Sequence, residues 1–324
     1  MRKLAIIGGG AWGSALACVA ARAGHETLMW CRSVSQTNEI SQFRTNGKYL
    51  GDLPIDRGVK AVSDISVATS NADIVLLSTP AQSLSSVLAD CEPLQESSVL
   101  ITTCKGIDQD TGKLPSETVK ERFPNHEVAA LSGPSFAHDV VQNLPTAVTI
   151  ASNSIETAEL LSESLSTHTF RCYASSDLKG AELGGALKNV LALAVGATRG
   201  MRLGASAEAA LIARGFAEIS RLAVGLGARP ETLMGLSGLG DITLTCSTPQ
   251  SRNFQFGMAL GAGDSLQGLK LAEGAFTASI ALRLAKEHNI DVPITSAIVD
   301  VLEKRVTARE AVEQLLTRPL KRES

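Results

Sequence analysis

The sequence predicts an amino-terminal α/β domain with a doubly wound parallel sheet, followed by an all-helical domain. In the first half, short apolar runs alternate with helical patterns, which is typical of a parallel sheet with helices on both faces. From about residue 177 the strand-like runs give way to long segments rich in Ala, Leu and Gly with helical spacing. A glycine-rich turn near the start of the chain joins a strand pattern to a helix pattern. We therefore place the two domains at residues 1–175 and 176–324.

Composition limits the classes of protein to which the chain can belong. Its 324 residues are enough for about two domains, and 44% of them are apolar but only 4% aromatic, which predicts aliphatic cores. The net charge of −3 gives no basic footprint for nucleic acid, and no apolar run reaches the ~18 residues needed to span a membrane. The six cysteines and five histidines lack metal or disulfide spacing. We expect no metal, reduced thiols and a cytoplasmic location.

The glycine-rich turn is the first candidate binding site. An apolar run at residues 4–7 ends at a G-x-G-x-x-G pattern formed by Gly8, Gly10 and Gly13. Gly8 permits a tight turn, Gly10 lets a pyrophosphate approach the backbone, and Gly13 lets the following helix lie close to the strand. The free N–H groups and the positive dipole end of that helix would face the phosphates. An ordinary glycine-rich turn is the alternative, but the strand–turn–helix context favours a dinucleotide site in a Rossmann-type domain.

The end of the second predicted strand, residues 26–30, indicates which dinucleotide binds. NAD sites usually place an Asp or Glu there to bind the ribose 2′-hydroxyl. No acid follows this strand, and Arg32 offers a guanidinium suited to a 2′-phosphate. A solvated loop arginine is the alternative. We expect NADP(H) to be favoured, or both NADP(H) and NAD(H) to be used.

Further strands are predicted by apolar runs at residues 73–79, 98–103, 127–131 and 146–151. The carboxyl ends of parallel strands border the ligand crevice of such a sheet. Lys105 follows one of these strands and faces the crevice, unless it is an ordinary surface lysine. The Gly-Pro-Ser sequence at 133–135 forms a rigid loop whose N–H groups would suit an anion. Residues 43–59, which contain several Gly and one Pro, are expected to form a loop.

Lys188 is the most informative residue of the second half. It lies within a helix predicted for residues 177–197, and its neighbours on the same face are small or apolar: Ala181, Gly184, Gly185, Leu191, Ala192 and Val195. A lysine buried on such a face has a lowered pKa, which is useful for proton transfer. The glycines indicate that another segment or a ligand approaches this face closely. A lysine reaching water from the helix edge is the alternative.

Two later segments carry polar groups of the kind that sites use. Asp241 follows a glycine-rich turn, where it either caps a helix or orients Lys188 or a substrate hydroxyl. Thr245 lies four residues further on. Ser251, Arg252 and Asn253 follow a proline-containing loop, and adjacent Arg and Asn donors suit a phosphate. A solvated charge at a helix start is the alternative for this second segment.

Over nearly its whole length the chain resembles the bacterial NAD(P)-dependent sn-glycerol-3-phosphate dehydrogenases. The matching blocks, in order, are IIGGGAWGSAL, TTCKGI, LSGPSFA, LGGALKNVLALAVG, GLSGLGDITLTC and SRN followed by FG. The resemblance implies reversible, NAD(P)H-dependent reduction of dihydroxyacetone phosphate to sn-glycerol 3-phosphate, which supplies the glycerol backbone of phospholipids.

The resemblance also implies roles for the matching residues. Lys188 would be the general acid/base, and Lys105, Asp241 and Thr245 would complete the reaction centre. With the glycine pattern, the implied cofactor contacts are Gly8, Gly10, Ala11, Trp12, Gly13, Arg32, Lys105, Ala137, Arg252, Leu271 and Glu273. The implied substrate contacts are Lys105, Gly133, Ser135, Lys188, Asn189, Asp241, Ser251, Arg252 and Asn253.

Two other functions are possible alternatives to this dehydrogenase. A 6-phosphogluconate-type or β-hydroxyacid dehydrogenase would pair the lysine with an asparagine four residues later, but that position is Ala192 and the asparagine is Asn189. A non-catalytic NADPH-sensing protein would have no need of Lys188, Asp241 and Arg252 together. The apolar second domain makes a homodimer the expected assembly.

Overall fold

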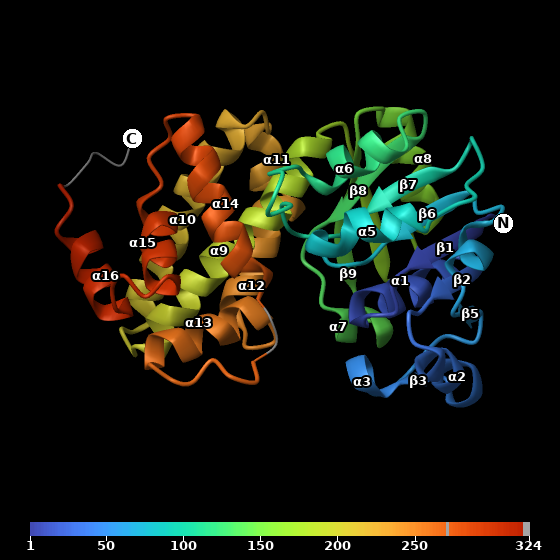
Figure 1. The fold of residues 1–324 in the computed structure, drawn as a ribbon, viewed down its shortest axis with the longest axis horizontal. Helices are drawn as coiled ribbons and strands as arrows, with labels where there is room; N and C mark the ends of the chain where they lie inside the picture. Colours follow the sequence, from blue (N-terminus) through green and yellow to red (C-terminus); the bar gives the residue numbers. More distant parts are fainter. Residues whose placement is uncertain (270–271, 320–324) are drawn as a thin grey trace.

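The computed structural model describes residues 1–269 and 272–319. Figure 1 shows a sheet covered by helices in the amino-terminal half and a cluster of helices in the carboxy-terminal half. The sheet has eight strands in the order β10-β9-β8-β7-β6-β1-β2-β5. The strands are β1 (Lys3–Ile7), β2 (Glu26–Trp30), β5 (Val59–Val62), β6 (Ile74–Leu77), β7 (Val99–Thr102), β8 (Glu127–Ser132), β9 (Thr146–Ser152) and β10 (Phe170–Ser175).

The strands from β5 to β8 run parallel in the order β5-β2-β1-β6-β7-β8, which is that of a doubly wound dinucleotide-binding sheet. The predicted doubly wound parallel sheet is confirmed, with one departure: β9 pairs antiparallel with β8. The β8–β9 connection holds just one short helix, α7 (Ala137–Val141). Five helical residues rise about 7.5 Å, which is too short to lead back along β8 to a parallel start.

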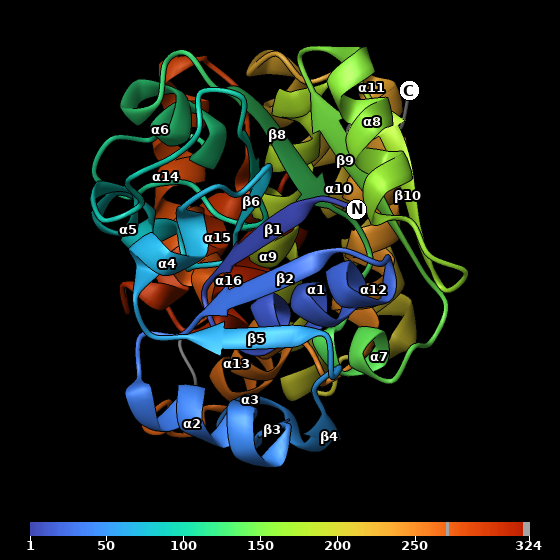
Figure 2. The ribbon, with the colours of Figure 1, turned by 90° about the vertical axis from the view of Figure 1, so that its right-hand side faces the viewer.

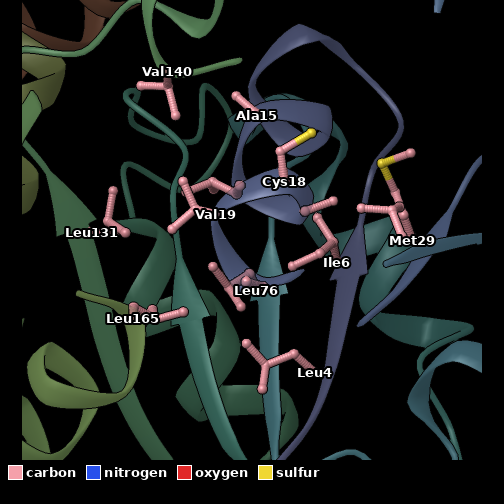
Figure 3. Packing of buried hydrophobic residues seen from close by; sticks show 14 of the residues in the cluster. Leu4, Ile6, Ala15, Cys18, Val19, Met29, Leu76, Leu131, Val140 and Leu165 are labelled. Atoms are coloured by element: carbon pink, nitrogen blue, oxygen red, sulfur yellow. The ribbon is translucent and has the colours of Figure 1, made fainter. Parts of the chain in front are cut away.

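Helices cover both faces of the sheet (Figure 2). One face packs against α7 and against α1 (Ala11–Arg22) and α8 (Ile155–Leu165); the other packs against α4 (Ile65–Thr69), α5 (Leu84–Ala89) and α6 (Pro115–Arg122). Side chains of β1 alternate between these cores, with Leu4 and Ile6 in the first (Figure 3) and Ala5 and Ile7 in the second. Burial on both faces explains why the strands are continuous apolar runs.

The segment predicted as a loop at residues 43–59 is more ordered than expected. It follows α2 (Val34–Phe43) and contains β3 (Thr45–Asn46), α3 (Gly47–Leu50) and β4 (Gly51–Pro54). Asn46 is fully buried, and its Nδ2 donates to the carbonyl oxygen of Gly9 at 3.0 Å and to Ser14 Oγ at 2.8 Å. The glycine-rich turn is therefore held from outside by a side chain of this segment.

The second half surrounds one buried helix, α9 (Leu178–Gly200), which Asp177 caps by accepting from the Gly180 N–H. The other helices are α10 (Ala205–Gly225), α11 (Pro230–Met234), α12 (Asp241–Ser247), α13 (Arg252–Ala262), α14 (Glu273–Glu287), α15 (Pro293–Leu302) and α16 (Ala308–Leu316). Helix α13 packs directly on the backbone of α9. A Cβ on Gly257 would lie 2.2 Å from the carbonyl oxygen of Leu193, so α13 approaches closely because it carries glycine there.

The structure also bears on membrane-spanning helices, metal sites and disulfides. Within residues 1–269 and 272–319, no helix is long and apolar enough to cross a membrane. The same residues contain no group of three or more His, Cys, Asp or Glu side chains that could hold a metal ion. All six cysteines are free thiols.

Candidate active site

Two lysines from the two halves of the chain share one buried carboxylate. Lys188 Nζ donates to Asp241 Oδ1 at 2.7 Å and to Thr245 Oγ1 at 2.6 Å. Lys105 Nζ donates to Asp241 Oδ2 at 2.6 Å and to the carbonyl oxygen of Gly133 at 2.8 Å. Asp241 is 1% exposed and Lys188 7% exposed. The cluster predicted from separate sequence blocks is therefore assembled in one place, with both ammonium groups held at fixed positions.

Glycines on the Lys188 face of α9 allow the other segments to reach it. A Cβ on Gly184 would lie 2.6 Å from the carbonyl oxygen of Ser237, in the turn before Asp241. A Cβ on Gly185 would lie 2.7 Å from Ser132 Oγ at the end of β8. The close approach predicted from these glycines is thus made by protein segments from both halves, and this approach buries Lys188.

Asp241 is delivered by a π-helical turn, η2 (Leu236–Gly240), in which the Gly240 N–H donates to the carbonyl oxygen of Gly235 at 3.1 Å. Gly240 is the N-cap of α12 and Asp241 is its first residue, so the alternative that Asp241 caps the helix is wrong. The positive end of the helix dipole favours a carboxylate there. Thr245, four residues later, lies on the same face and donates to Asp241 Oδ1 at 3.2 Å.

The surroundings prepare Lys188 to exchange a proton. Burial and, to a smaller extent, the positive charge of Lys105 lower its pKa to about 8, against the opposing attraction of Asp241. Burial raises the pKa of Asp241, but the charges of Lys105 and Lys188 outweigh burial and keep that pKa below its ordinary value. Asp241 therefore stays ionised, while Lys188 can lose and regain a proton near neutral pH.

Two asparagines link the cluster to the helices behind it. Asn189 Nδ2 donates to the carbonyl oxygen of Lys105 at 2.8 Å, and Asn253 Nδ2 donates to Asn189 Oδ1 at 2.9 Å. The Gly274 N–H completes the chain by donating to Asn253 Oδ1 at 2.9 Å. These amides join the segment after β7 to α9, α13 and α14, a function that the predicted substrate contacts had not included.

The expected phosphate-binding segment lies at the start of α13. Ser251 is buried and caps this helix by accepting from the Phe254 N–H. Arg252 is exposed, and its guanidinium makes no hydrogen bond within the described part of the chain. Burial raises the pKa of Glu273 at the start of α14, while the charges of Arg252, Lys188 and Lys105 oppose that rise. Leu271 lies outside the described residues.

The glycine-rich turn has the shape that a bound pyrophosphate requires. Gly8 has a φ of +125°, and a Cβ on Gly13 would lie 1.8 Å from the carbonyl oxygen of Gly8. A Cβ on Gly10 would meet no atom within 4 Å, so open space lies beside the backbone at that point. Within the described residues, no side chain caps the start of α1, and the buried Trp12 Nε1 has no hydrogen-bond partner. These features fit a dinucleotide.

Arg32 and Ala137, two of the other expected cofactor contacts, lie near this turn. Arg32 is exposed and stands two residues after Trp30, whose carbonyl oxygen accepts from the Gly8 N–H at 3.2 Å. Ala137 begins α7 and packs into the core beneath α1, together with Ala11. Ser135 Oγ donates to the carbonyl oxygen of Gly133 at 3.1 Å, and the same oxygen accepts from Lys105 Nζ, so the 133–135 loop lies beside Lys105.

A dinucleotide-binding sheet and a buried lysine on the first helix of a helical domain together define the class of two-domain NAD(P)-dependent dehydrogenases. Models of the NAD-dependent glycerol-3-phosphate dehydrogenase amino and carboxyl termini match residues 3–158 and 177–313. The chain belongs to this glycerol-3-phosphate dehydrogenase family and is an oxidoreductase. This membership excludes the 6-phosphogluconate-type alternative.

Close relatives support the assignment over the full length. The chain is 50% identical over 322 residues to glycerol-3-phosphate dehydrogenase (NAD(P)+) of Brucella canis, covering 99% of both chains. It is also 50% identical over 321 residues to the enzyme of that name from Chelativorans sp., covering 99% of this chain and 98% of the other. The crystal structure of glycerol-3-phosphate dehydrogenase from Coxiella burnetii superposes with a TM-score of 0.92 at 35% identity, covering 98% of this chain and 99% of that one.

Proposed function

We propose that this protein reduces dihydroxyacetone phosphate to sn-glycerol 3-phosphate, reversibly and with NAD(P)H, and so supplies the glycerol backbone of phospholipids. The observation that carries the proposal is the buried Asp241 carboxylate bonded to both Lys105 and Lys188. Two lysines held in this way would place one proton donor, Lys188, and one fixed cation, Lys105, beside the carbonyl oxygen of the substrate. The names of the relatives supply the substrate class.

Each residue of the cluster has a distinct role in the proposed reaction. A nicotinamide dinucleotide held at the glycine-rich turn would supply the hydride that the ketone carbon accepts, and negative charge would then develop on the carbonyl oxygen. Lys188 Nζ donates a proton to that oxygen, and Lys105 Nζ stabilises the developing charge as a second cation. Asp241 holds both ammonium groups in place, and Thr245 fixes Lys188 from the other side. In the reverse direction, neutral Lys188 accepts the proton.

The phosphate of the substrate is assigned to the start of α13, with Ser251, Arg252 and Asn253, and the 133–135 loop is assigned to the opposite side. The guanidinium of Arg252, which makes no hydrogen bond to residues 1–269 or 272–319, suits a phosphate because it can donate two parallel hydrogen bonds. The side-chain amides of Asn189 and Asn253 already form hydrogen bonds within the protein. Their contribution to substrate binding therefore includes holding the site in shape.

The turn of Gly8, Gly10, Ala11, Trp12 and Gly13 is assigned to the pyrophosphate of the cofactor. The remaining cofactor contacts are assigned to Arg32, Lys105, Ala137, Arg252, Leu271 and Glu273. Arg32 is exposed just after β2, and no Asp or Glu stands there to bind the ribose 2′-hydroxyl of NAD. This supports a preference for NADP(H).

The decisive test is oxidation of NADPH with dihydroxyacetone phosphate by the wild type and by Lys188→Ala. We expect the variant to lose about 10²- to 10⁴-fold in kcat, the usual contribution of proton transfer. Lys179→Ala is the matched control, because Lys179 lies on the same helix but is half-exposed and paired with Glu117 at 3.8 Å. Absence of turnover by the wild type would refute the function, and near-normal turnover by Lys188→Ala would refute the role of this lysine.

Three further expectations complete the proposal. The division into domains at residues 175/176 is supported by the end of β10 at Ser175 and the start of α9 at Leu178. A homodimer is supported by exposed apolar side chains on the helical half, such as Leu203 and Val224, and light scattering tests it. A cytoplasmic location is tested by cell fractionation.

A further inference from the structure

A buried carboxylate on α9 joins the two halves of the chain next to the reacting groups. Glu182 precedes Lys188 on this helix and is 3% exposed. Its Oε1 accepts from Thr102 Oγ1 at 3.0 Å and from the Ser116 N–H at 2.9 Å, and its Oε2 accepts from Ser116 Oγ. Thr102 ends β7 and Ser116 lies in the first turn of α6, so all three donors belong to the sheet domain.

The donors to Glu182 lie close in the chain to Lys105, so Glu182 can influence the reacting groups as well as the packing of the two domains. Lys105 follows Thr102 by three residues, so the carboxylate fixes the helix that carries Lys188 to the strand that leads to Lys105. Burying a carboxylate is costly, and within the described residues Glu182 forms no ion pair that would offset the cost. Burial accordingly raises the pKa of Glu182 to about 7. An apolar side chain would fill the same space without that cost.

We propose that Glu182 is a positioning residue that sets the register between Lys105 and Lys188 across the two domains. The inference rests on the roles proposed above for these two lysines. Without the carboxylate, α9 is released from β7 at this point, and the two ammonium groups no longer meet the two oxygens of Asp241 in the same geometry. A misplacement of about 1 Å in a reacting group costs on the order of 100-fold in rate.

The helical domain contains a closely matched control. Glu218 on α10 is 2% exposed and also accepts three hydrogen bonds, from the N–H groups of Ile294 and Thr295 and from Thr295 Oγ1, each at 2.8 Å. Its donors all lie at the start of α15, within the same domain. Replacing either glutamate by methionine removes a buried carboxylate with three donors, but only the Glu182 change acts across the domain boundary.

The experiment measures kcat, the Kd for NADPH by fluorescence quenching, and urea stability for Glu182→Met, Glu182→Gln and Glu218→Met. We expect Glu182→Met to lose about 10- to 100-fold in kcat, with the Kd for NADPH changed less than about threefold. The Kd should hold because the carboxylate of Glu182 accepts its hydrogen bonds from Thr102 and Ser116, whereas the pyrophosphate is assigned to the glycine-rich turn. Glu182→Gln should recover most of kcat, since its amide can accept from Thr102 and donate to Ser116 Oγ.

Thr102→Val covers the case in which Glu182→Met does not fold. It removes one donor at constant shape and should lower kcat in the same direction by a smaller factor. Equal kcat losses in Glu182→Met and Glu218→Met, or a Kd for NADPH that rises as much as kcat falls, would overturn the inference. The assay of the wild type and Lys188→Ala separates the two levels. Absence of turnover by the wild type refutes the proposed function, and near-normal turnover by Lys188→Ala refutes the role of Lys188. An active wild type and an inactive Lys188→Ala, with Glu182 variants that behave like Glu218→Met, refute only the role of Glu182.

Discussion

Glu182 predicts a specific pH dependence of stability. Burial raises its pKa from an ordinary 4.5 to about 7, because the hydrogen bonds from Ser116 and Thr102 offset only part of the cost of burial. The folded protein therefore holds this proton more tightly than the unfolded chain. The stabilisation is fully present below about pH 4.5 and is lost as the pH rises to about 7 and above. Linkage with these two pKa values gives a loss of about 2.5 kcal/mol between pH 5 and pH 8.

The assay compares the free energy of unfolding in urea for the wild type and Glu182→Gln at several pH values between about 5 and 8. Glutamine cannot ionise, so the difference between the two proteins isolates the contribution of Glu182. The neighbouring charge of Glu117 on α6, and the Lys179 ammonium that pairs with Glu117, are present in both proteins, so their effects cancel. We expect the difference, wild type minus variant, to fall by about 2.5 kcal/mol from pH 5 to pH 8. A difference constant to within about 0.5 kcal/mol would show that the folded protein does not retain this proton.

Two further predictions concern the dinucleotide end of the site. Arg32→Ala should weaken NADPH binding about 10-fold or more and NADH binding little, because only NADPH carries the 2′-phosphate that a guanidinium would pair with. Fluorescence titration measures both affinities. Equal losses of affinity for NADPH and NADH would refute the assignment. Asn46→Asp should raise the KM for NADPH, because it replaces the N–H donor to the Gly9 carbonyl oxygen by an acceptor, at a cost of about 1–3 kcal/mol. Exposed Asn71→Asp is the control, and an unchanged KM in Asn46→Asp would show that the turn holds its shape without this bond.

The sequence predicted those parts of the fold and site whose signal is local. The strands β1, β6, β7 and β8 are runs of mainly apolar residues, and the glycine spacing marks the turn by itself. Lys188 could be singled out because the residues that share its helix face, all small or apolar, lie within the single predicted helix at 177–197. The antiparallel direction of β9 was not predicted, because it depends on how short a helix the connection forms rather than on any residue pattern.

Groups whose partners are far away in the chain were missed for the same reason. Glu182 reads as an ordinary polar residue in a helix, and its donors lie 66 and 80 residues earlier. Asn46 lies in a polar, glycine-containing stretch that gives no periodic signal, yet it is fully buried against Gly9. A polar side chain within an otherwise small or apolar helix face was the available clue for Glu182, and no comparable clue existed for Asn46.

The joint between the two domains explains why so many polar groups are buried around the proposed reaction centre. Apolar contact across the joint, such as that of Ile107 and Leu114 with the helical core, favours burial but does not fix direction. The bonds of Asp241 to Lys105, of Asn189 to the Lys105 carbonyl oxygen and of Glu182 to β7 and α6 do fix direction, because hydrogen bonds weaken steeply when misaligned. A proton donor on one domain and a cation on the other stay in register only if the joint cannot slide, and directional bonds between buried groups meet that requirement.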